Sequence, residues 1–217
     1  MTKLPEHVRR VLPADTATTW QRLAPHLPAG LYLGGDTAVA VRLCHRESRD
    51  LDFFFHRPVD LDRLRRRLGE LGQFAVTQES EGTLKGLFSA TKLEFFDASK
   101  LTLLGEPETV AGLHVAGLPD LIAMKIKVMA ERGEMRDYFD VMALDEDGRV
   151  SLEEGIGFYM ERYGINPHEG ALQHLYLAMG SFDDVEVDEA LPIDKDSLER
   201  WWVKRQALAL RNANRFG

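Results

Sequence analysis

The hydrophobic pattern changes at about residue 117, and this change limits the possible folds more than any other feature of the chain. Before residue 117, short apolar runs indicate strands at residues 31–33, 49–55, 74–78, 84–90 and 92–96. Helical patterns lie between them, at residues 16–26, where Asp15 is a candidate N-cap, and at residues 36–43 and 60–71. After residue 117 the apolar patterns are helical, at residues 118–132, 137–144, 152–163, 169–179 and 197–212. We therefore predict an α+β fold, with a small mixed sheet and flanking helices over residues 1–117 and a helical C-terminal domain over residues 118–217.

The composition is that of an ordinary globular protein, with 44% hydrophobic and 29% charged residues among 217. No apolar run approaches the roughly 18 residues that a membrane-spanning helix needs, so we expect no membrane association. The single cysteine, Cys44, excludes an internal disulfide and lies in an apolar run, which predicts a small buried side chain. This cysteine usage favours a reducing, cytoplasmic location.

The net charge of −8 argues against a surface that binds nucleic acid over its whole area. It leaves room for a local basic patch. Arg63, Arg65, Arg66 and Arg67 form such a cluster, although a solvated helix face is its simplest interpretation.

Two carboxylates in the strand predicted at residues 49–55 indicate a metal site. Asp50 and Asp52 are two residues apart, so they point to the same face of a strand, whereas Leu51 and Phe53 point into the core. Such a pair repels itself unless a cation neutralises it, and hard oxygen ligands suit Mg²⁺. The alternative is a pair of solvated carboxylates on a surface strand.

A glycine turn upstream of this strand is a candidate phosphate-binding loop. Gly34 and Gly35 follow a short buried strand and precede a helix, where backbone N–H groups can hold an anion. Gly35 allows close approach of a phosphate, and Thr37 could donate its hydroxyl to the same oxygens. A plain connector between strand and helix is the alternative.

Glu94 is a candidate third carboxylate, because it interrupts the apolar run of residues 92–96. Together with Asp50 and Asp52 it could complete a two-metal site, and it would be the natural general base for an attacking hydroxyl. The alternative is an edge-strand glutamate in water.

The helical half contains a second charged group. Lys125 and Arg132 are seven residues apart and share a helix face among apolar neighbours, so Lys125 needs an anionic partner. Asp137 and Asp140, three apart on a following helix, could orient Lys125, Arg132 or an acceptor. The alternative is an internal salt-bridge network between the two helices, and both interpretations can hold together.

In this order and spacing, the motifs resemble the AbiEii/MenT-type nucleotidyltransferase toxins, a branch of the DNA polymerase beta-like superfamily. The resemblance covers residues 31–202. It rests on the following residues and segments: Gly35-Asp36-Thr37, Arg46 and Ser48 before Asp50-Leu51-Asp52, Glu94, residues 120–125, residues 132–140, residues 182–184 and Trp201.

The resemblance implies a nucleotidyltransferase core followed by a helical domain that contributes to the active site. It implies transfer of NMP from an NTP to an acceptor hydroxyl, expected to be the 3′ end of tRNA, by the toxin of a bacterial toxin–antitoxin pair whose antitoxin is encoded nearby. The implied cofactor is Mg²⁺ or Mn²⁺ on Asp50, Asp52 and Glu94. The implied nucleotide-binding residues are Gly34, Gly35, Thr37, Ser48, Lys125 and Arg132; Lys125 and Asp137 join the three carboxylates as catalytic residues.

One residue departs from the pattern of the superfamily. Asp36 stands where Gly or Ser is usual, and its negative charge would repel a triphosphate. Asp36 therefore favours an alternative, a catalytically degenerate member that binds a nucleotide or a partner. A metal-dependent glycosyltransferase that uses the Asp50–Asp52 pair is a further alternative.

Overall fold

The computed structural model describes residues 3–166 and 170–213, which form two compact units, Met1–Gly117 and Leu118–Gly217. Glu169, where the predicted helix over residues 169–179 begins, lies outside the described residues. Within the described residues, no helix combines the length and the apolar character that crossing a membrane requires.

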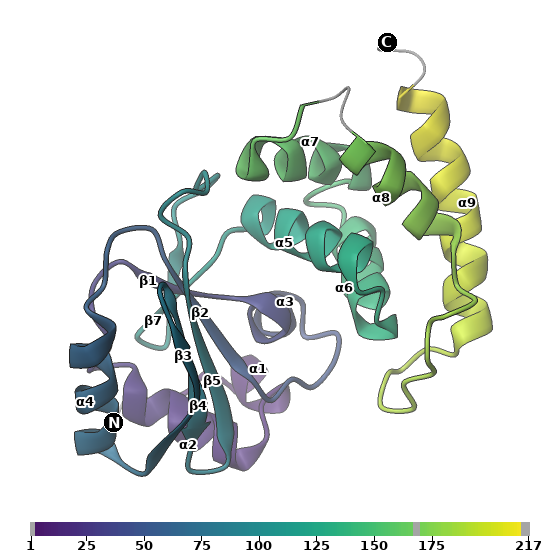
Figure 1. Cartoon of the computed structure of the whole chain (residues 1–217). Helices are drawn as coiled ribbons and strands as arrows, with labels where there is room; N and C mark the ends of the chain where they lie inside the picture. Colours follow the sequence, from purple (N-terminus) through teal and green to yellow (C-terminus); the bar gives the residue numbers. More distant parts are fainter. Residues whose placement is uncertain (1–2, 167–169, 214–217) are drawn as a thin grey trace. The chain divides into compact units, whose positions relative to one another are not determined.

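The N-terminal unit is built on a seven-stranded mixed sheet, as predicted for this part of the chain (Figure 1). Its strands are β1 (Leu31–Gly34), β2 (Leu51–Phe55), β3 (Phe74–Ser80), β4 (Thr83–Phe88), β5 (Thr91–Asp97), β6 (Glu108–Val110) and β7 (Leu113–Val115). They lie in the order β3-β4-β5-β2-β1-β7-β6, with β2 parallel to β5 and β1 parallel to β7. The sequence analysis missed β6 and β7, which are only three residues long and are joined by a tight turn at Ala111 and Gly112, both with positive φ.

Strand β2 shows the alternation that its sequence predicts. Leu51, Phe53 and Phe55 are buried, while Asp52 and Phe54 are partly exposed on the opposite face. Each face is extended by a neighbouring aromatic ring of β5, because Phe95 stacks on Phe53 at 5.2 Å and Phe96 stacks on Phe54 at 5.3 Å between ring centroids. This register also places Asp52 opposite Glu94.

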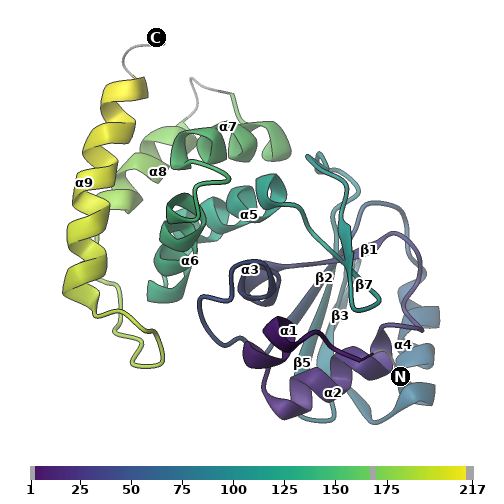
Figure 2. The ribbon, with the colours of Figure 1, turned by 180° about the vertical axis from the view of Figure 1, so that it is seen from behind.

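Four helices complete the N-terminal unit: α1 (Glu6–Arg10), α2 (Ala14–Leu23), α3 (Gly35–Leu43) and α4 (Leu61–Leu71). Helices α3 and α4 lie on opposite sides of the sheet (Figure 1, and from behind in Figure 2). Helix α4 buries Leu64 and Leu68, and Asp60 caps it by accepting a bond from the Arg63 backbone N–H at 2.9 Å.

Two local predictions in this unit are wrong. Helix α2 begins at Ala14 after Pro13, so Asp15 lies in its first turn and is not the N-cap; the fixed φ of proline suits the start of a helix. Cys44 is exposed and not buried, because α3 ends at Leu43 and Cys44 takes a left-handed conformation (φ 56°) where the chain leaves the helix.

The C-terminal unit is helical in its described residues, with α5 (Leu118–Glu131), α6 (Met135–Glu146), α7 (Leu152–Tyr163), α8 (Gly170–Gly180) and α9 (Lys195–Ala213). Helix α5 packs against α6, α7 and α8. Gly155 lets α7 approach closely, since a Cβ there would lie 2.6 Å from Ile122 Cδ1. Trp202 of α9 is fully buried, and its Nε1 donates to the Tyr138 carbonyl at 3.3 Å, which ties α9 to α6.

Candidate active site

Asp52 and Gly35 meet where β2 begins and β1 ends. Their close approach follows from the sheet, because Gly34 pairs with Asp52 across the antiparallel β1–β2 ladder. Gly35 has φ +63°, and a Cβ built there would overlap Asp52 Oδ2 and lie 3.2 Å from its Cγ. Glycine is therefore required at this position both by the backbone conformation and by the carboxylate beside it.

The charge of Asp52 is poorly compensated. Burial, followed by the negative charges of Asp36, Glu94 and Asp50 in that order, raises its pKa from 3.8 to about 7. Lys92 opposes the shift only weakly. Asp52 thus lies at the centre of an acidic group that a cation would stabilise.

Glu94 lies next to Asp52 but is held by lysines. Its Oε1 is 2.8 Å from Lys92 Nζ and 3.3 Å from Lys85 Nζ. The hydrogen bond to Glu94 is the main cause that raises the pKa of Lys92. The sequence analysis missed both lysines, although Lys92 is two residues from Glu94 on the same strand and therefore points to the same face. Lys85, in β4, lies opposite Glu94 across the β4–β5 ladder.

Thr37 and Ser48 brace the loop before β2. The fully buried Thr37 hydroxyl donates to the Asp50 carbonyl, and its oxygen is 2.7 Å from the Ser48 hydroxyl. The Ser48 backbone N–H donates to Val11 at 2.9 Å. Both hydroxyls therefore fix the position of Asp50 in this structure, and direct phosphate binding by Thr37 or Ser48 stays a prediction.

Asp36 is paired with a buried arginine. Arg46 Nη2 lies 3.0 Å from Asp36 Oδ2, and only 7% of the Arg46 side chain is exposed. This pair reduces the repulsion that an acid in the glycine turn would exert on a phosphate, while the residual field of Asp36 still contributes to the raised pKa of Asp52.

The donor chemistry of Asp50 and Asp52 fits a hard divalent cation, since carboxylate oxygens are the ligands that Mg²⁺ prefers. Neutralisation of their mutual repulsion would offset the cost expressed in the raised pKa of Asp52. Within residues 3–166 and 170–213, no group of three or more His, Cys, Asp or Glu side chains is arranged to hold a metal ion. The two aspartates are thus the ligands that the structure supports best, and the lysine contacts of Glu94 would have to change for it to join them.

The C-terminal unit contains a separate, fully paired cluster. Lys125 is 1% exposed, and its Nζ lies 3.1 Å from Asp137 Oδ1 and 2.6 Å from Asp140 Oδ2. Arg132 Nε donates to Asp137 Oδ2 at 2.8 Å. These ion pairs confirm that α5 and α6 are joined by an internal salt-bridge network. A second buried pair that the sequence analysis missed, Asp120 with Arg162, joins α5 to α7.

The predicted site residues thus gather in two groups, one in each unit. The N-terminal group holds Gly34, Gly35, Thr37, Ser48, Asp50, Asp52 and Glu94. The C-terminal group holds Lys125, Arg132 and Asp137. Each group is in contact within itself.

A mixed sheet with an acid-bearing strand beside a glycine turn and a helix N-terminus defines a protein of the nucleotidyltransferase fold. Solved structures that share this fold include the following two. One is a candidate nucleotidyltransferase from H. pylori, with a TM-score of 0.56 and 17% identity over 99% of both chains. The other is the antibiotic-resistance factor ANT(2″)-Ia, with a TM-score of 0.55 and 17% identity over 74% of this chain and 95% of that chain.

The chain belongs to the AbiEii family, the nucleotidyl transferase toxins of type IV toxin–antitoxin systems, whose family model matches residues 20–201. This confirms the family that the motifs predicted. A relative from Aquifex aeolicus (strain VF5), the uncharacterized protein aq_aa25, is 34% identical over 127 residues. The match spans 57% of this chain and 61% of that protein. None of these comparisons supports the glycosyltransferase alternative.

Proposed function

We propose that the chain transfers a nucleoside monophosphate from an NTP to the 3′ end of a tRNA, with Mg²⁺, as the toxin of a toxin–antitoxin pair. Its family and fold support nucleotidyl transfer. The antitoxin would be a separate protein encoded nearby. Mn²⁺ is an alternative metal.

The observation that carries the proposal is the position of the Asp52 carboxylate against Gly35 at the start of α3. The first N–H groups of a helix lack intrahelical partners and favour anions, whereas Asp52 and its acidic neighbours favour a cation. A site that favours an anion at the helix N-terminus and a cation at Asp52 suits a metal–triphosphate complex better than either a metal or an anion alone.

The residues of the N-terminal unit can then be assigned roles. Asp50 and Asp52 would hold Mg²⁺, which supplies charge neutralisation at the triphosphate and lowers the pKa of the attacking hydroxyl. The backbone at Gly34 and Gly35 would bind phosphate oxygens. Thr37 and Ser48 keep Asp50 in place.

In the reaction, the acceptor oxygen forms a bond to the α-phosphorus while the bond to the leaving pyrophosphate breaks. Glu94 would take the proton of the acceptor hydroxyl. Lys92 and Lys85, which hold Glu94 in this structure, would offer their charge to the phosphates once Glu94 is released. By family resemblance, Lys125 and Arg132 would contact the nucleotide, and Asp137 would position them.

Incubation of the protein with Mg²⁺, each labelled NTP in turn and total tRNA tests the proposal. We expect label on the tRNA 3′ end, and a transfer rate reduced to background by Asp52→Ala or by EDTA. Absence of transfer with every NTP, or equal transfer by Asp52→Ala, would contradict it.

Asp36 favours a second candidate, a degenerate member that binds a nucleotide or a partner without turnover, because its charge adds to the acidic field at Asp52. The Asp36–Arg46 pair at 3.0 Å weakens this candidate. Calorimetric titration of NTP with Mg²⁺, measured apart from turnover, separates the two: binding without transfer to any RNA supports the degenerate member.

A further inference from the structure

The N-terminal unit has a cavity of 790 Å³ where β1 begins and β2 ends. Asp52 lies at the opposite end of these two antiparallel strands. Its walls come from the segment before β1, the segment after β2 and helix α4, and include Pro28 and Pro58. The β1–β2 register pairs Gly34 with Asp52 at the acidic end and Leu31 with Phe55 at the cavity end. Three residues of strand, about 10 Å, therefore separate the two ends.

The cavity carries an excess of positive charge. Arg63, Arg66 and Arg67 line it together with the acids Asp60 and Glu70. Both acids are already engaged, because Asp60 caps α4 and Glu70 lies 3.3 Å from Arg67. In the part of the chain that the structure describes, no side chain forms a hydrogen bond or ion pair with the guanidinium of Arg63 or Arg66.

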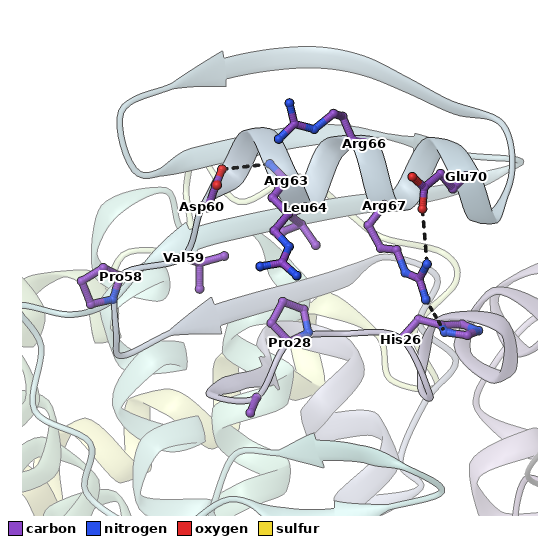
Figure 3. Close-up of a pocket in the computed structure, with 11 residues that line it drawn as sticks. His26, Pro28, Pro58, Val59, Asp60, Arg63, Leu64, Arg66, Arg67 and Glu70 are labelled. Atoms are coloured by element: carbon purple, nitrogen blue, oxygen red, sulfur yellow. Dashed lines mark hydrogen bonds and ion pairs between the residues drawn. The ribbon is translucent and has the colours of Figure 1, made fainter.

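Two of the three arginine side chains point into the cavity, whereas Arg66 points away from it, to the other side of α4 (Figure 3). Figure 3 shows Arg63 pointing toward Pro28 and Arg67 pointing toward His26. The distance between Arg67 Nη2 and His26 Nδ1 is 3.1 Å. Arg65, on the same helix, does not line the cavity and pairs with Asp62 at 3.0 Å and Glu79 at 3.7 Å. The cluster Arg63–Arg67 is therefore more than the solvated helix face that is its simplest interpretation from sequence.

The chemistry of the walls fits a nucleic acid backbone. Guanidinium groups bind phosphate oxygens through paired N–H donors, and the apolar surface of Pro28, Pro58 and Val59 can cover a sugar or base. The volume lies within the range of about 300–1,000 Å³ that is usual for ligand sites. Because the whole chain has a net charge of −8, an RNA needs such a local basic site to stay bound.

We propose that this cavity binds a phosphodiester segment of the acceptor RNA, away from the 3′ end that reacts. The proposal rests on the proposed function and names a second contact for its substrate. A unit of 117 residues has a radius of gyration of only about 13 Å, so a folded RNA can contact the cavity and the acidic site together.

The test compares Arg63→Gln with Arg65→Gln in the full chain. Each change removes one charge from α4, but Arg63 lines the cavity and Arg65 does not. We expect Arg63→Gln to weaken tRNA binding about tenfold and to reduce the salt dependence of binding by about one phosphate contact. Arg65→Gln should leave both quantities near the wild-type values. Fluorescence anisotropy with labelled tRNA over a salt series measures both, and thermal unfolding verifies that each variant is folded.

Two further readouts separate the sources of phosphate. Binding of ATP with Mg²⁺, and NMP transfer to a dinucleotide acceptor, whose single phosphodiester cannot span both sites, should be unchanged in Arg63→Gln. Equal tRNA affinity of the two variants would overturn the proposal, and so would a loss of ATP affinity with unchanged tRNA affinity. A wild-type protein that binds tRNA without transferring label contradicts the proposed function instead, and the Arg63 and Arg65 comparison still decides the cavity.

Discussion

The two units treat buried charge in opposite ways. In the C-terminal unit, Asp137 and Asp140 each have a cationic nitrogen within 3.1 Å. In the N-terminal unit, the acids around Asp52 outweigh their cationic partners, and the pKa of Asp52 rises to about 7. A charge-balanced cluster is satisfied without a ligand and stabilises the fold, whereas burial of Asp52 among other acids costs folding free energy that a bound cation can offset. The difference predicts that the first cluster contributes more to the stability of the fold and the second more to binding of a cation, whether or not the first also contacts the nucleotide.

The largest expected effect separates these roles at Asp52. Asp52→Asn should lower the transfer rate by about 10³-fold or more, because it removes a metal-binding charge. The same change should not lower the free energy of unfolding, because the amide lacks the charge that burial and neighbouring acids disfavour. Initial rates and urea denaturation of the same preparation measure both. If Asp52→Asn loses activity because it unfolds, Asp52 stabilises the fold, and the predicted difference between the two clusters is wrong.

The converse change is Lys125→Met in the C-terminal cluster. It leaves Asp137 and Asp140 with less compensation in a fully buried site, so we expect a loss of about 3–5 kcal/mol in the free energy of unfolding. Lys127→Met is the matched control on the same helix, because Lys127 pairs with the exposed Glu131 and should contribute less than about 1 kcal/mol. Urea denaturation of both variants measures the difference. Equal losses would show that the buried cluster is not the structural element inferred here.

A change at Gly35 tests how closely the backbone must approach Asp52. Gly35→Ala should lower the transfer rate about 100-fold, because the added Cβ displaces the Asp52 carboxylate. Gly164→Ala is the control, since Gly164 has φ +62°, close to the +63° of Gly35, and its Cβ would meet nothing within 4 Å. Both variants should lose about 1 kcal/mol of stability from the left-handed backbone. If the control loses as much activity as Gly35→Ala, backbone strain and not the carboxylate is responsible.

Local patterns in the sequence were sufficient for most of the fold. The alternation in residues 49–55 predicts which side chains of β2 are buried, and the 3- and 4-residue spacing of leucines predicts α4. Strands β6 and β7 escaped because three residues carry too little periodicity, and β7 is defined by its pairing with the distant β1. The end of α3 at Leu43 was predicted, but the exposure of Cys44 follows from its left-handed conformation after the helix, which the apolar pattern does not specify.

The candidate site was predictable in its residues but not in their partners. Asp52 and Glu94 follow from charges inside apolar runs, whereas Asp50, which was predicted on the same strand as Asp52, lies just before β2 begins at Leu51. The lysines on Glu94 follow from the register of β4 with β5, which pairs Lys85 with Glu94 across a ladder that no local pattern specifies. Likewise, the pairing of Asp36 with Arg46 and the burial of Thr37 against Ser48 depend on how the loop before β2 folds back.

The last expected effect is a pH dependence of stability to which Asp52 contributes. Folded Asp52 keeps its proton up to about pH 7, whereas the unfolded chain releases it near pH 3.8, so the folded state binds more protons between these values. The contribution of Asp52 to stability should therefore fall as pH rises from about 4 to about 7 and then stay level, by at most about 4 kcal/mol. The difference in unfolding free energy between the wild type and Asp52→Asn, measured across this range, isolates the contribution of Asp52. Excess Mg²⁺ at pH 7 should restore stability to the wild type and not to the variant, because a cation that binds the ionised carboxylate stabilises the folded state. A difference independent of both pH and Mg²⁺ would mean that the acidic cluster is as well compensated as the cluster around Lys125.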